Sequence, residues 1–235
     1  MYTQLIIVEG MDNTGKSTLI EEYKNVINGL NPNIKIEVIH MEKPPKELMG
    51  MDIEGEPINY YKLNEFQHNT YMELPNKLRE IRNRKNSPDI LILDRAWLSE
   101  YVYGHLYRKR SKKDIIIDNI IIEKKIMNIF GANNVHLIYL YPENLKFIKH
   151  YEDGKSLVVL KSKEVWPTDK DAQKRFIDKQ LYEELLMFNE AFNELSILEN
   201  KIPIQVNKSG SDNIFKNNTI VEIFKSLDFS LFISN

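Results

Sequence analysis

Residues 4–18 read QLIIVEGMDNTGKST, and this stretch decides the fold. Its first part, Gln4–Glu9, is a short run rich in isoleucine and valine, which is typical of a buried parallel strand. Gly10 then opens the pattern G-x-x-x-x-G-K-S/T, which ends at Ser17, and a helix is expected from Lys16 to Ile27. In such a loop, backbone N–H groups and the positive end of the helix converge on phosphate oxygens. The sequence therefore predicts a phosphate-binding site at the end of the first strand.

Each part of this loop has an expected partner on a nucleoside triphosphate. Lys16 is expected to bridge the β- and γ-phosphates, Ser17 to bind Mg²⁺ through its hydroxyl, and Thr18 to reach an α-phosphate oxygen. A glycine-rich turn that binds nothing is the alternative, but the strand before it and the helix after it favour binding of ATP with Mg²⁺. The predicted nucleotide-binding residues are Gly10, Asn13, Thr14, Gly15, Lys16, Ser17 and Thr18.

The rest of the chain alternates between strand-like and helix-like stretches. Further strands are expected at Lys35–His40, Ile90–Leu93, His136–Tyr141 and Ile202–Val206. Helices are expected at Tyr60–Arg84, Trp97–Tyr107, Ile115–Phe130, Asn144–His150, Asp171–Glu199 and Asn213–Leu227. This alternation predicts an α/β fold, with a five-stranded parallel sheet flanked by helices. We expect a single domain over residues 1–235 and a mobile lid over residues 151–170.

Composition excludes several classes of protein. The chain has 235 residues, 32 Lys+Arg against 34 Asp+Glu, and no cysteine, so it has neither disulfides nor thiolate metal sites. A net charge of −2 gives no general attraction to nucleic acid. The one dense basic run, RKRSKK at residues 108–113, is interpreted as solvated, with a polyphosphate or DNA contact as the alternative. A signal peptide and a membrane-spanning stretch are not apparent, so a cytoplasmic protein is expected.

A second group of charged residues follows the expected strand Ile90–Leu93. Asp94 and Arg95 lie at its carboxyl end, where open α/β sheets bind ligands. Asp94 is expected to hold Mg²⁺ through water, and the planar guanidinium of Arg95 to grip a phosphate. The alternatives for Asp94 are a surface ion pair or a helix cap.

Both stretches carry a family resemblance. Residues 9–18 (EGMDNTGKST) resemble the E-G-x-D-x-x-G-K-S-T loop of the thymidylate kinase family. Residues 94–104 (DRAWLSEYVYG) resemble its D-R-Y-x-x-S-x-x-A-Y-Q segment, and more closely that of its deoxynucleoside monophosphate kinase relatives from phages. The resemblance implies a P-loop NTPase fold and ATP-dependent phosphorylation of a deoxynucleoside monophosphate, dTMP or a related pyrimidine, to the diphosphate. Relatives commonly form two-fold dimers, so a homodimer is compatible with the resemblance.

The resemblance further implies roles for individual residues at the acceptor. Asp12 corresponds to the aspartate that contacts the acceptor near its 3′-hydroxyl, and Arg95 to the arginine that holds the acceptor phosphate. Ser99 corresponds to the motif serine. Tyr103 corresponds to the tyrosine that packs on the deoxyribose and excludes a 2′-hydroxyl, which implies a preference for deoxyribonucleotides.

The expected lid departs from the family pattern. Between Lys149 and Lys170 the chain has no arginine, although some relatives carry a transition-state arginine there. Lys161 or Lys163 is expected to close over the phosphates, and Arg175 is a substitute if the lid is shorter. Lysine supplies a point charge without the bidentate fork of arginine. A solvated loop without a catalytic role is the alternative.

The expected base-reading region is also altered. The family reads thymine with a stacking phenylalanine and an arginine four residues later; here Phe66 is the candidate stacker and Thr70 stands at the arginine position. Gln67 offers paired hydrogen bonds to a base edge instead. The alternative is that Phe66, like Tyr71 and Leu74, faces the core of an amphipathic helix.

Glu42 leaves two enzyme functions open. A glutamate at this place acts as general base in kinases that phosphorylate a hydroxyl, whereas a loop carboxylate paired with Lys43 would have no such role. The alternative function is therefore a kinase for a deoxynucleoside or for a hydroxymethyl-pyrimidine in DNA. A nucleotide-switched binding protein without a small-molecule acceptor is the alternative from another class.

Overall fold

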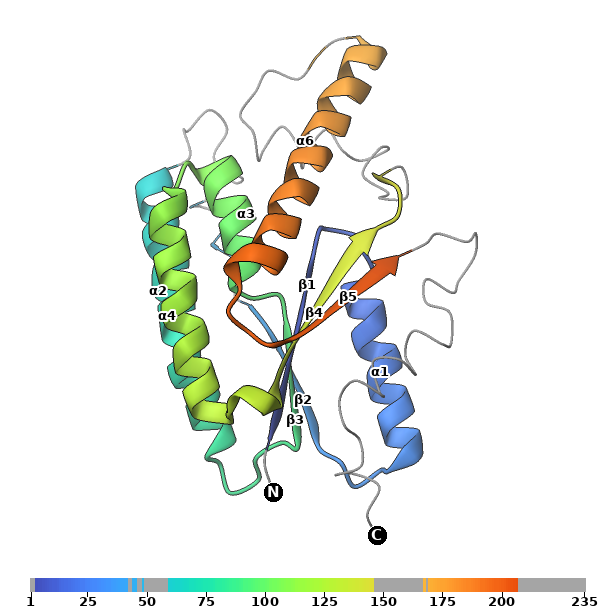
Figure 1. The fold of residues 1–235 in the computed structure, drawn as a ribbon, viewed down its shortest axis with the longest axis vertical. Coiled ribbons are helices and arrows are strands. Elements are labelled where there is room, and N and C mark those ends of the chain that lie inside the picture. The colour runs from blue at the N-terminus through green and yellow to red at the C-terminus, as the bar shows by residue number, and fades with distance from the viewer. Residues whose placement is uncertain are drawn as a thin grey trace.

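The computed structural model describes residues 3–41, 44–45, 48, 59–145, 167 and 169–206. Its strands form one parallel sheet in the order β2-β3-β1-β4-β5 (Figure 1). The strands are β1 (Gln4–Gly10), β2 (Ile36–His40), β3 (Ile90–Asp94), β4 (Val135–Pro142) and β5 (Asn200–Val206). Every end lies within two residues of its prediction. The predicted α/β class and five-stranded parallel sheet are confirmed.

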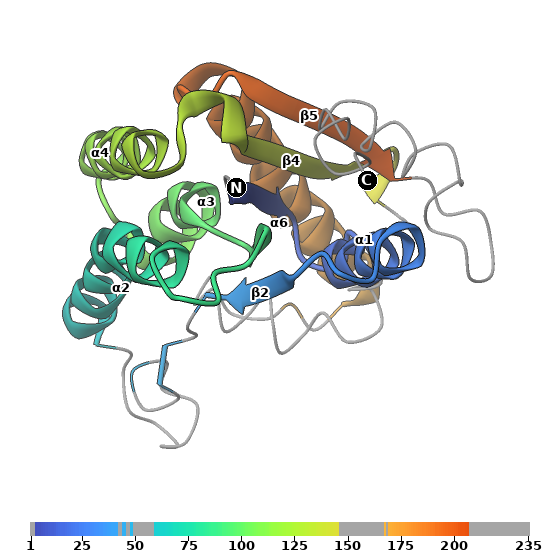
Figure 2. The same cartoon turned by 90° about the horizontal axis from the view of Figure 1, so that it is seen from below.

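The helices cover the two faces of the sheet unequally. One face carries α1 alone among the described helices, whereas four others pack on the opposite face (Figures 1 and 2). The helices are α1 (Lys16–Leu30), α2 (Tyr60–Arg82), α3 (Trp97–Arg108), α4 (Lys112–Phe130) and α6 (Lys170–Glu190). A short 3-10 helix, η2 (Ala132–Asn134), leads into β4. Both faces of the central strands are therefore buried, which explains why β1 reads as a continuous apolar run.

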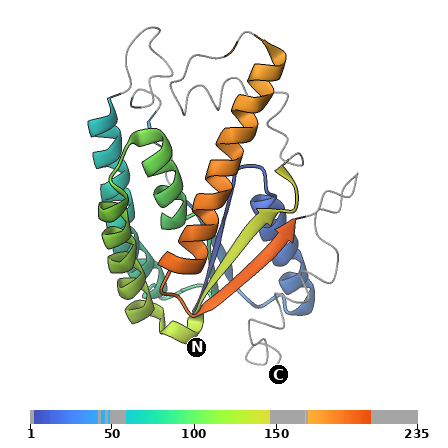
Figure 3. The ribbon, with the colours of Figure 1, turned by 45° about the horizontal axis from the view of Figure 1, so that its top comes forward.

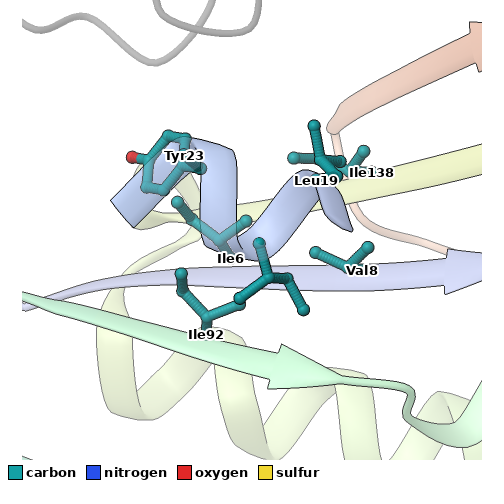
Figure 4. Close-up of a pocket in the computed structure, with 7 residues that line it drawn as sticks. Ile6, Val8, Leu19, Tyr23, Ile92 and Ile138 are labelled. Carbon is teal, nitrogen blue, oxygen red and sulfur yellow. The ribbon is translucent and has the colours of Figure 1, made fainter. Parts of the chain in front are cut away.

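The side chains of β1 alternate between the two cores. Leu5 and Ile7 belong to the larger core, whereas Ile6 and Val8 pack with α1. A small hollow remains between α1 and the sheet (Figure 4), and no charged residue lines it. It is an apolar gap in the packing on the α1 side and offers nothing that would hold a phosphate.

One helix ends earlier than predicted. The expected helix Asp171–Glu199 is replaced by α6 and a five-residue π-helix, η4 (Ala191–Leu195). Beyond it, Lys201 Nζ donates hydrogen bonds to the carbonyl oxygens of Phe192 (2.9 Å) and Asn193 (3.3 Å). The carboxylate of Glu123 on α4 accepts the N–H of Ile197 at 2.6 Å. The prediction was wrong here because charged groups from other elements satisfy the backbone at the end of the helix.

Several expectations fall outside the described residues. These are the helix Asn213–Leu227, most of the helix Asn144–His150 and nearly all of the lid at residues 151–170. The single-domain assignment stays a prediction. Within the part of the chain that the structure describes, no helix has the length and apolar character needed to span a membrane.

Candidate active site

The candidate site lies at the carboxyl edge of the sheet, where β1 ends between its two neighbours. Strand register places Val8 opposite Asp94 of β3 and Gly10 opposite Leu140 of β4. The loop between β1 and α1 is therefore flanked by the ends of β3 and β4. Figure 3 shows β1, in dark blue, turning into α1. Ligands of open α/β sheets bind at such a position, where successive strands lie on opposite sides of the first.

Backbone conformation shapes the loop. Gly10 and Gly15 have φ values of 143° and 85°, and Asn13 has a φ of 61°. A Cβ atom at Gly10 would lie 2.3 Å from the carbonyl oxygen of Leu140, so only glycine fits against β4. The Thr14 hydroxyl donates a 2.8 Å hydrogen bond to the carbonyl oxygen of Met11. The loop is thus held in a tight curl by its own residues.

Lys16 is folded back into this curl. Its Nζ donates hydrogen bonds to the carbonyl oxygens of Gly10 (3.0 Å) and Met11 (2.6 Å), and the residue is buried. Burial lowers the pKa of Lys16 to about 7, and the nearby Arg95 acts in the same direction. Three carboxylates oppose this decrease: those of Asp12, Glu9 and Asp94. A buried ammonium bonded to neutral carbonyl groups would gain strongly from an anionic partner.

Arg95 occupies a constrained position beside the loop. Its φ of 71° is unusual for a residue with a side chain, and its N–H donates to the carbonyl oxygen of Val8 at 3.0 Å. The guanidinium forms an ion pair with Asp12 and lies 5.9 Å from the centre of the Tyr103 ring. Burial disfavours the charged form, but Asp12 outweighs it and raises the pKa of Arg95 above its ordinary value. The structure thus brings Asp12, Arg95 and Tyr103 together.

Glu9 belongs to this region but was not among the predicted site residues. Its buried carboxylate accepts the backbone N–H groups of Ala96 (2.8 Å), Leu98 (3.1 Å) and Ser99 (3.3 Å), and the Ser99 hydroxyl at 2.6 Å. Burial raises the pKa of Glu9, while these hydrogen bonds oppose the change. Glu9 therefore caps α3 and joins the phosphate loop to the segment of Arg95. A carboxylate ending an otherwise apolar strand was the available signal.

Asp94 and Ser17 lie at the edge expected for a metal. Asp94 bonds His40 Nδ1 of β2 at 2.9 Å and keeps only 12% of its side chain exposed. Ser17, in the first turn of α1, is exposed, and Thr18 beside it is half-buried. The role of His40 as a partner of Asp94 was not predicted, because it depends on the register between β2 and β3.

On the side of α3 and α6, aromatic residues and a buried carboxylate pack behind the site. The Tyr103 ring lies 6.0 Å from the Tyr107 ring and 5.7 Å from the Phe188 ring. The Tyr107 hydroxyl donates a hydrogen bond to Glu184 of α6, which is buried. Tyr107, Phe188 and Glu184 were not predicted as part of this wall, since neither spacing nor motif connects α6 to α3.

The predicted base-reading residues lie on α2. Phe66 is half-buried and is not among the core residues, whereas Tyr71 and Leu74 belong to the larger core, as the alternative interpretation expected. Gln67 is buried with 5% exposure. The Thr70 hydroxyl donates to the carbonyl oxygen of Phe66 at 2.9 Å. Thr70 therefore uses its hydroxyl within the helix.

The basic run at residues 108–113 has a structural role that the sequence did not indicate. Arg108 and Arg110 both pair with Glu100, which is 3% exposed. Arg110 also pairs with Asp118 at 2.8 Å, and His68 bonds the same carboxylate at 2.9 Å. The solvated interpretation was wrong for these two arginines, because partners from α2, α3 and α4 surround them. Glu42, Lys161 and Lys163 lie outside the described residues.

Comparisons with solved structures identify the fold. Thymidylate kinase from Ehrlichia chaffeensis superposes with a TM-score of 0.52 over 97% of this chain and 100% of its own, at 12% identity. Thymidylate kinase from Candida albicans superposes with a TM-score of 0.51 over 99% of this chain and 94% of its own, also at 12% identity. The chain has the thymidylate kinase fold. No protein-family model and no curated protein sequence matches it. The similarity to these proteins is therefore one of fold. Residues 9–18 and 94–104, which resemble segments of the thymidylate kinase family, lie within this fold.

Proposed function

We propose that the protein is a kinase that transfers a phosphoryl group from ATP to a deoxynucleoside monophosphate, dTMP or a related pyrimidine. The observation that carries this proposal is the placement of two basic residues, Lys16 and Arg95, at the ends of adjoining strands. Asp12 pairs with Arg95 and also interacts electrostatically with Lys16. Phosphoryl transfer mainly requires alignment of donor and acceptor and neutralisation of charge on the moving group. The two cations provide one anion site each.

The roles follow from the loop and from the end of β3. Backbone N–H groups of the loop bind the β- and γ-phosphates of ATP, and Lys16 exchanges its carbonyl partners for their oxygens. Arg95 holds the acceptor phosphate. An oxygen of that phosphate forms a bond to the γ-phosphorus as the bond to the ADP oxygen breaks. An ionised monophosphate needs no strong base for this step.

The residues present fit Mg²⁺. The described part of the chain holds no group of three His, Cys, Asp or Glu side chains that would bind a metal by themselves. Mg²⁺ in kinases is held by one or two protein groups together with substrate phosphates. Ser17, which is exposed, and Asp94 would serve in this way. When bound, the ion would neutralise negative charge on the ATP phosphates.

A hydroxyl acceptor is less well supported than a phosphate. Such an acceptor needs a general base within reach of its proton. The described carboxylates at this edge are already engaged: Asp12 by Arg95, Asp94 by His40, and Glu9 by the start of α3. Glu42 remains the candidate base for that alternative. Glu42→Gln would cripple a hydroxyl kinase and spare a monophosphate kinase.

One assay tests the proposal. Radiolabelled ATP is incubated with nucleosides, nucleoside monophosphates and DNA, using wild-type protein, Lys16→Ala and Arg95→Ala. We expect a labelled diphosphate from a deoxynucleoside monophosphate, and loss of product in both variants with the fold intact. Arg84→Ala, which removes an exposed arginine paired with Glu37, is the matched control and should retain turnover. ATP binding without product on any acceptor would favour the nucleotide-switched protein, and full turnover in either variant would refute the assigned roles.

A further inference from the structure

The start of α3 is held by a residue of another element. A helix leaves its first backbone N–H groups without partners inside the helix, and a Ser, Thr, Asp or Asn side chain at the N-cap usually accepts one of them. Three described helices follow this rule, because Asn59, Ser111 and Asp169 cap α2, α4 and α6. At α3 the N-cap residue is Ala96, whose side chain has no acceptor. Glu9 of β1 takes over this role.

The carboxylate of Glu9 makes four hydrogen bonds to the start of α3. One oxygen accepts the backbone N–H groups of Ala96, Leu98 and Ser99, and the other accepts the Ser99 hydroxyl at 2.6 Å. Side chains alternate along a strand, so Glu9 points to the same face of the sheet as Ile7, the face on which α3 packs. The cap of this helix therefore comes from a residue 87 positions before it.

This arrangement is more costly than a local cap. Glu9 is fully buried, and burial disfavours the charged form of its carboxylate, which raises its pKa. A serine or aspartate at position 96 would cap α3 without placing a charge in the protein interior. Such a local cap would not, however, fix the distance between α3 and β1. Sequences depart from local rules of this kind mainly at functional sites, and the element that Glu9 holds carries the proposed acceptor residues.

Arg95 lies between two anchors that β1 provides. Its own N–H donates to the carbonyl oxygen of Val8 at 3.0 Å, and the next N–H, that of Ala96, donates to Glu9 at 2.8 Å. The N–H groups on both sides of the Arg95 Cα atom are therefore bonded to consecutive residues of β1. They hold the backbone at a φ of 71°, which a residue with a side chain keeps only where its surroundings determine it. This backbone sets the direction in which the Arg95 side chain leaves the chain.

A shift of α3 against β1 would move the proposed acceptor residues together. Tyr103 lies on α3, and the centre of its ring is 5.9 Å from the Arg95 guanidinium. The phosphate loop would not follow, because it is held by its own contacts, such as the 2.8 Å hydrogen bond from Thr14 to the carbonyl oxygen of Met11. The hydrogen bonds of Glu9 oppose such a shift.

We propose that Glu9 is a positioning residue, which holds Arg95 and Tyr103 at the distance from the phosphate loop that phosphoryl transfer requires. This inference rests on the proposed function and adds a residue that, being fully buried, touches neither nucleotide. Glu9 directly precedes Gly10, the first residue of the loop, so a single residue joins the donor site to the acceptor site. Alignment is much of what a protein contributes to this reaction, and a displacement of about 1 Å can cost about a hundredfold in rate.

Steady-state kinetics with ATP and dTMP, well below the melting temperature of each variant, test the inference. We expect Glu9→Ala to lower kcat about a hundredfold and to raise KM for dTMP, while the dissociation constant of ADP, measured by calorimetry, stays within about threefold of wild type. Glutamine keeps one oxygen for the backbone N–H groups and donates to the Ser99 hydroxyl oxygen, so Glu9→Gln should recover a large part of the loss. A purely structural role predicts instead that ADP binding and dTMP binding decline in parallel.

Two controls separate positioning from stability. Glu123→Gln makes the same change in another buried carboxylate, one that accepts the indole N–H of Trp97 on α3 at 2.7 Å. It should lower the melting temperature and leave KM for dTMP unchanged. Arg95→Lys keeps a charge without the planar fork, so Glu9→Ala should lower kcat/KM for dTMP less in that background than in wild type.

The outcomes distinguish this inference from the proposed function. Wild-type kcat and KM in folded Glu9→Ala, or an equal rise of KM in Glu123→Gln, would overturn the inference and leave the proposed function standing. Multiplicative effects of Glu9→Ala and Arg95→Lys would show that Glu9 does not act through Arg95 and would overturn it as well. A wild-type protein that phosphorylates no deoxynucleoside monophosphate would overturn both. Should Glu9→Ala melt early, Ser99→Ala removes one hydrogen bond of the carboxylate, and a smaller loss of the same kind is expected.

Discussion

In the described part of the chain, two clusters of ion pairs contain buried or half-buried arginines, and the partners of these arginines differ. At the phosphate loop, Arg95 pairs with a loop carboxylate, and the neighbouring Lys16 bonds two neutral carbonyl oxygens. At the α3–α4 connection, Arg108 and Arg110 share one buried carboxylate, and Arg110 binds a second. The first cluster sits at a strand edge and the second sits between three helices.

This difference indicates which basic residues are available to a ligand. Neutral carbonyl groups and a loop carboxylate are partners that a phosphate can replace, because the phosphate brings more charge and more acceptor oxygens. Glu100 is 3% exposed and holds two guanidinium groups, so removing it would leave both without compensation in a protein interior. The partners of the loop cluster therefore fit the proposed binding role, whereas those of the α3–α4 cluster hold the helices together.

Substitution of Lys16 should give the largest effect on function and the clearest contrast between the clusters. We expect Lys16→Met to reduce phosphoryl transfer at least about a thousandfold, since a group that stabilises transferring charge is lost. The same change should raise the melting temperature of the ligand-free protein, because it removes a buried ammonium. Turnover and thermal melting test the two effects, with Lys24→Met at an exposed pair as the control. A lower melting temperature would contradict the view that burial of the Lys16 ammonium costs stability.

Substitution of Glu100 should lower the stability of the protein, in contrast to substitution of Lys16. We expect Glu100→Ala to lower the free energy of unfolding by about 3–5 kcal/mol, because Arg108 and Arg110 lose their shared partner. The measurement is urea unfolding. Glu21→Ala, at an exposed pair on α1, is the control and should cost less than about 1 kcal/mol. Equal losses in the two variants would remove the distinction drawn between the clusters.

Binding of ATP should change the protonation of Lys16. In the free protein burial lowers the pKa of Lys16 to about 7, so the side chain is mostly neutral at pH 8 and mostly charged at pH 6. Bound phosphates raise this pKa, and ATP binding should therefore take up close to one proton at pH 8 and almost none from this residue at pH 6. Calorimetry in buffers of different ionisation enthalpy measures the uptake. The same uptake at both pH values would exclude Lys16 as its source.

Substitution of His136, which lies away from both clusters, should have the smallest effect on the protein. It is buried in β4, burial lowers its pKa to about 4, and within the described structure neither ring nitrogen has a hydrogen-bond partner. Unfolding restores a pKa near 6.5, so the stability present above pH 6.5 is lost as the pH falls toward 4.

We therefore expect His136→Leu to be more stable than wild type at pH 5 by about 2 kcal/mol, with a flatter dependence of stability on pH between 4 and 6.5. Thermal melting across this range measures both. An unchanged slope in His136→Leu would contradict the assignment.

Local patterns predicted the strands and most helix limits, and the phosphate-binding role that they predict for the loop between β1 and α1 stays a prediction. Periodicity and turn residues act over a few positions, so they placed every strand end within two residues. The same reasoning failed at the end of α6, where Lys201 and Glu123 satisfy backbone groups from outside the helix. It also missed His40, whose contact with Asp94 depends on the pairing of β2 with β3.

The amino-acid order by itself thus determined where phosphates are expected to bind, because a glycine loop between a strand and a helix is a local arrangement. Only the tertiary structure decided which charges face one another. In the folded chain Asp12 pairs with Arg95, 83 residues away, and Arg108 and Arg110 both pair with Glu100. An ion pair depends on distance and burial, and both arise from the packing of elements that are far apart in the chain.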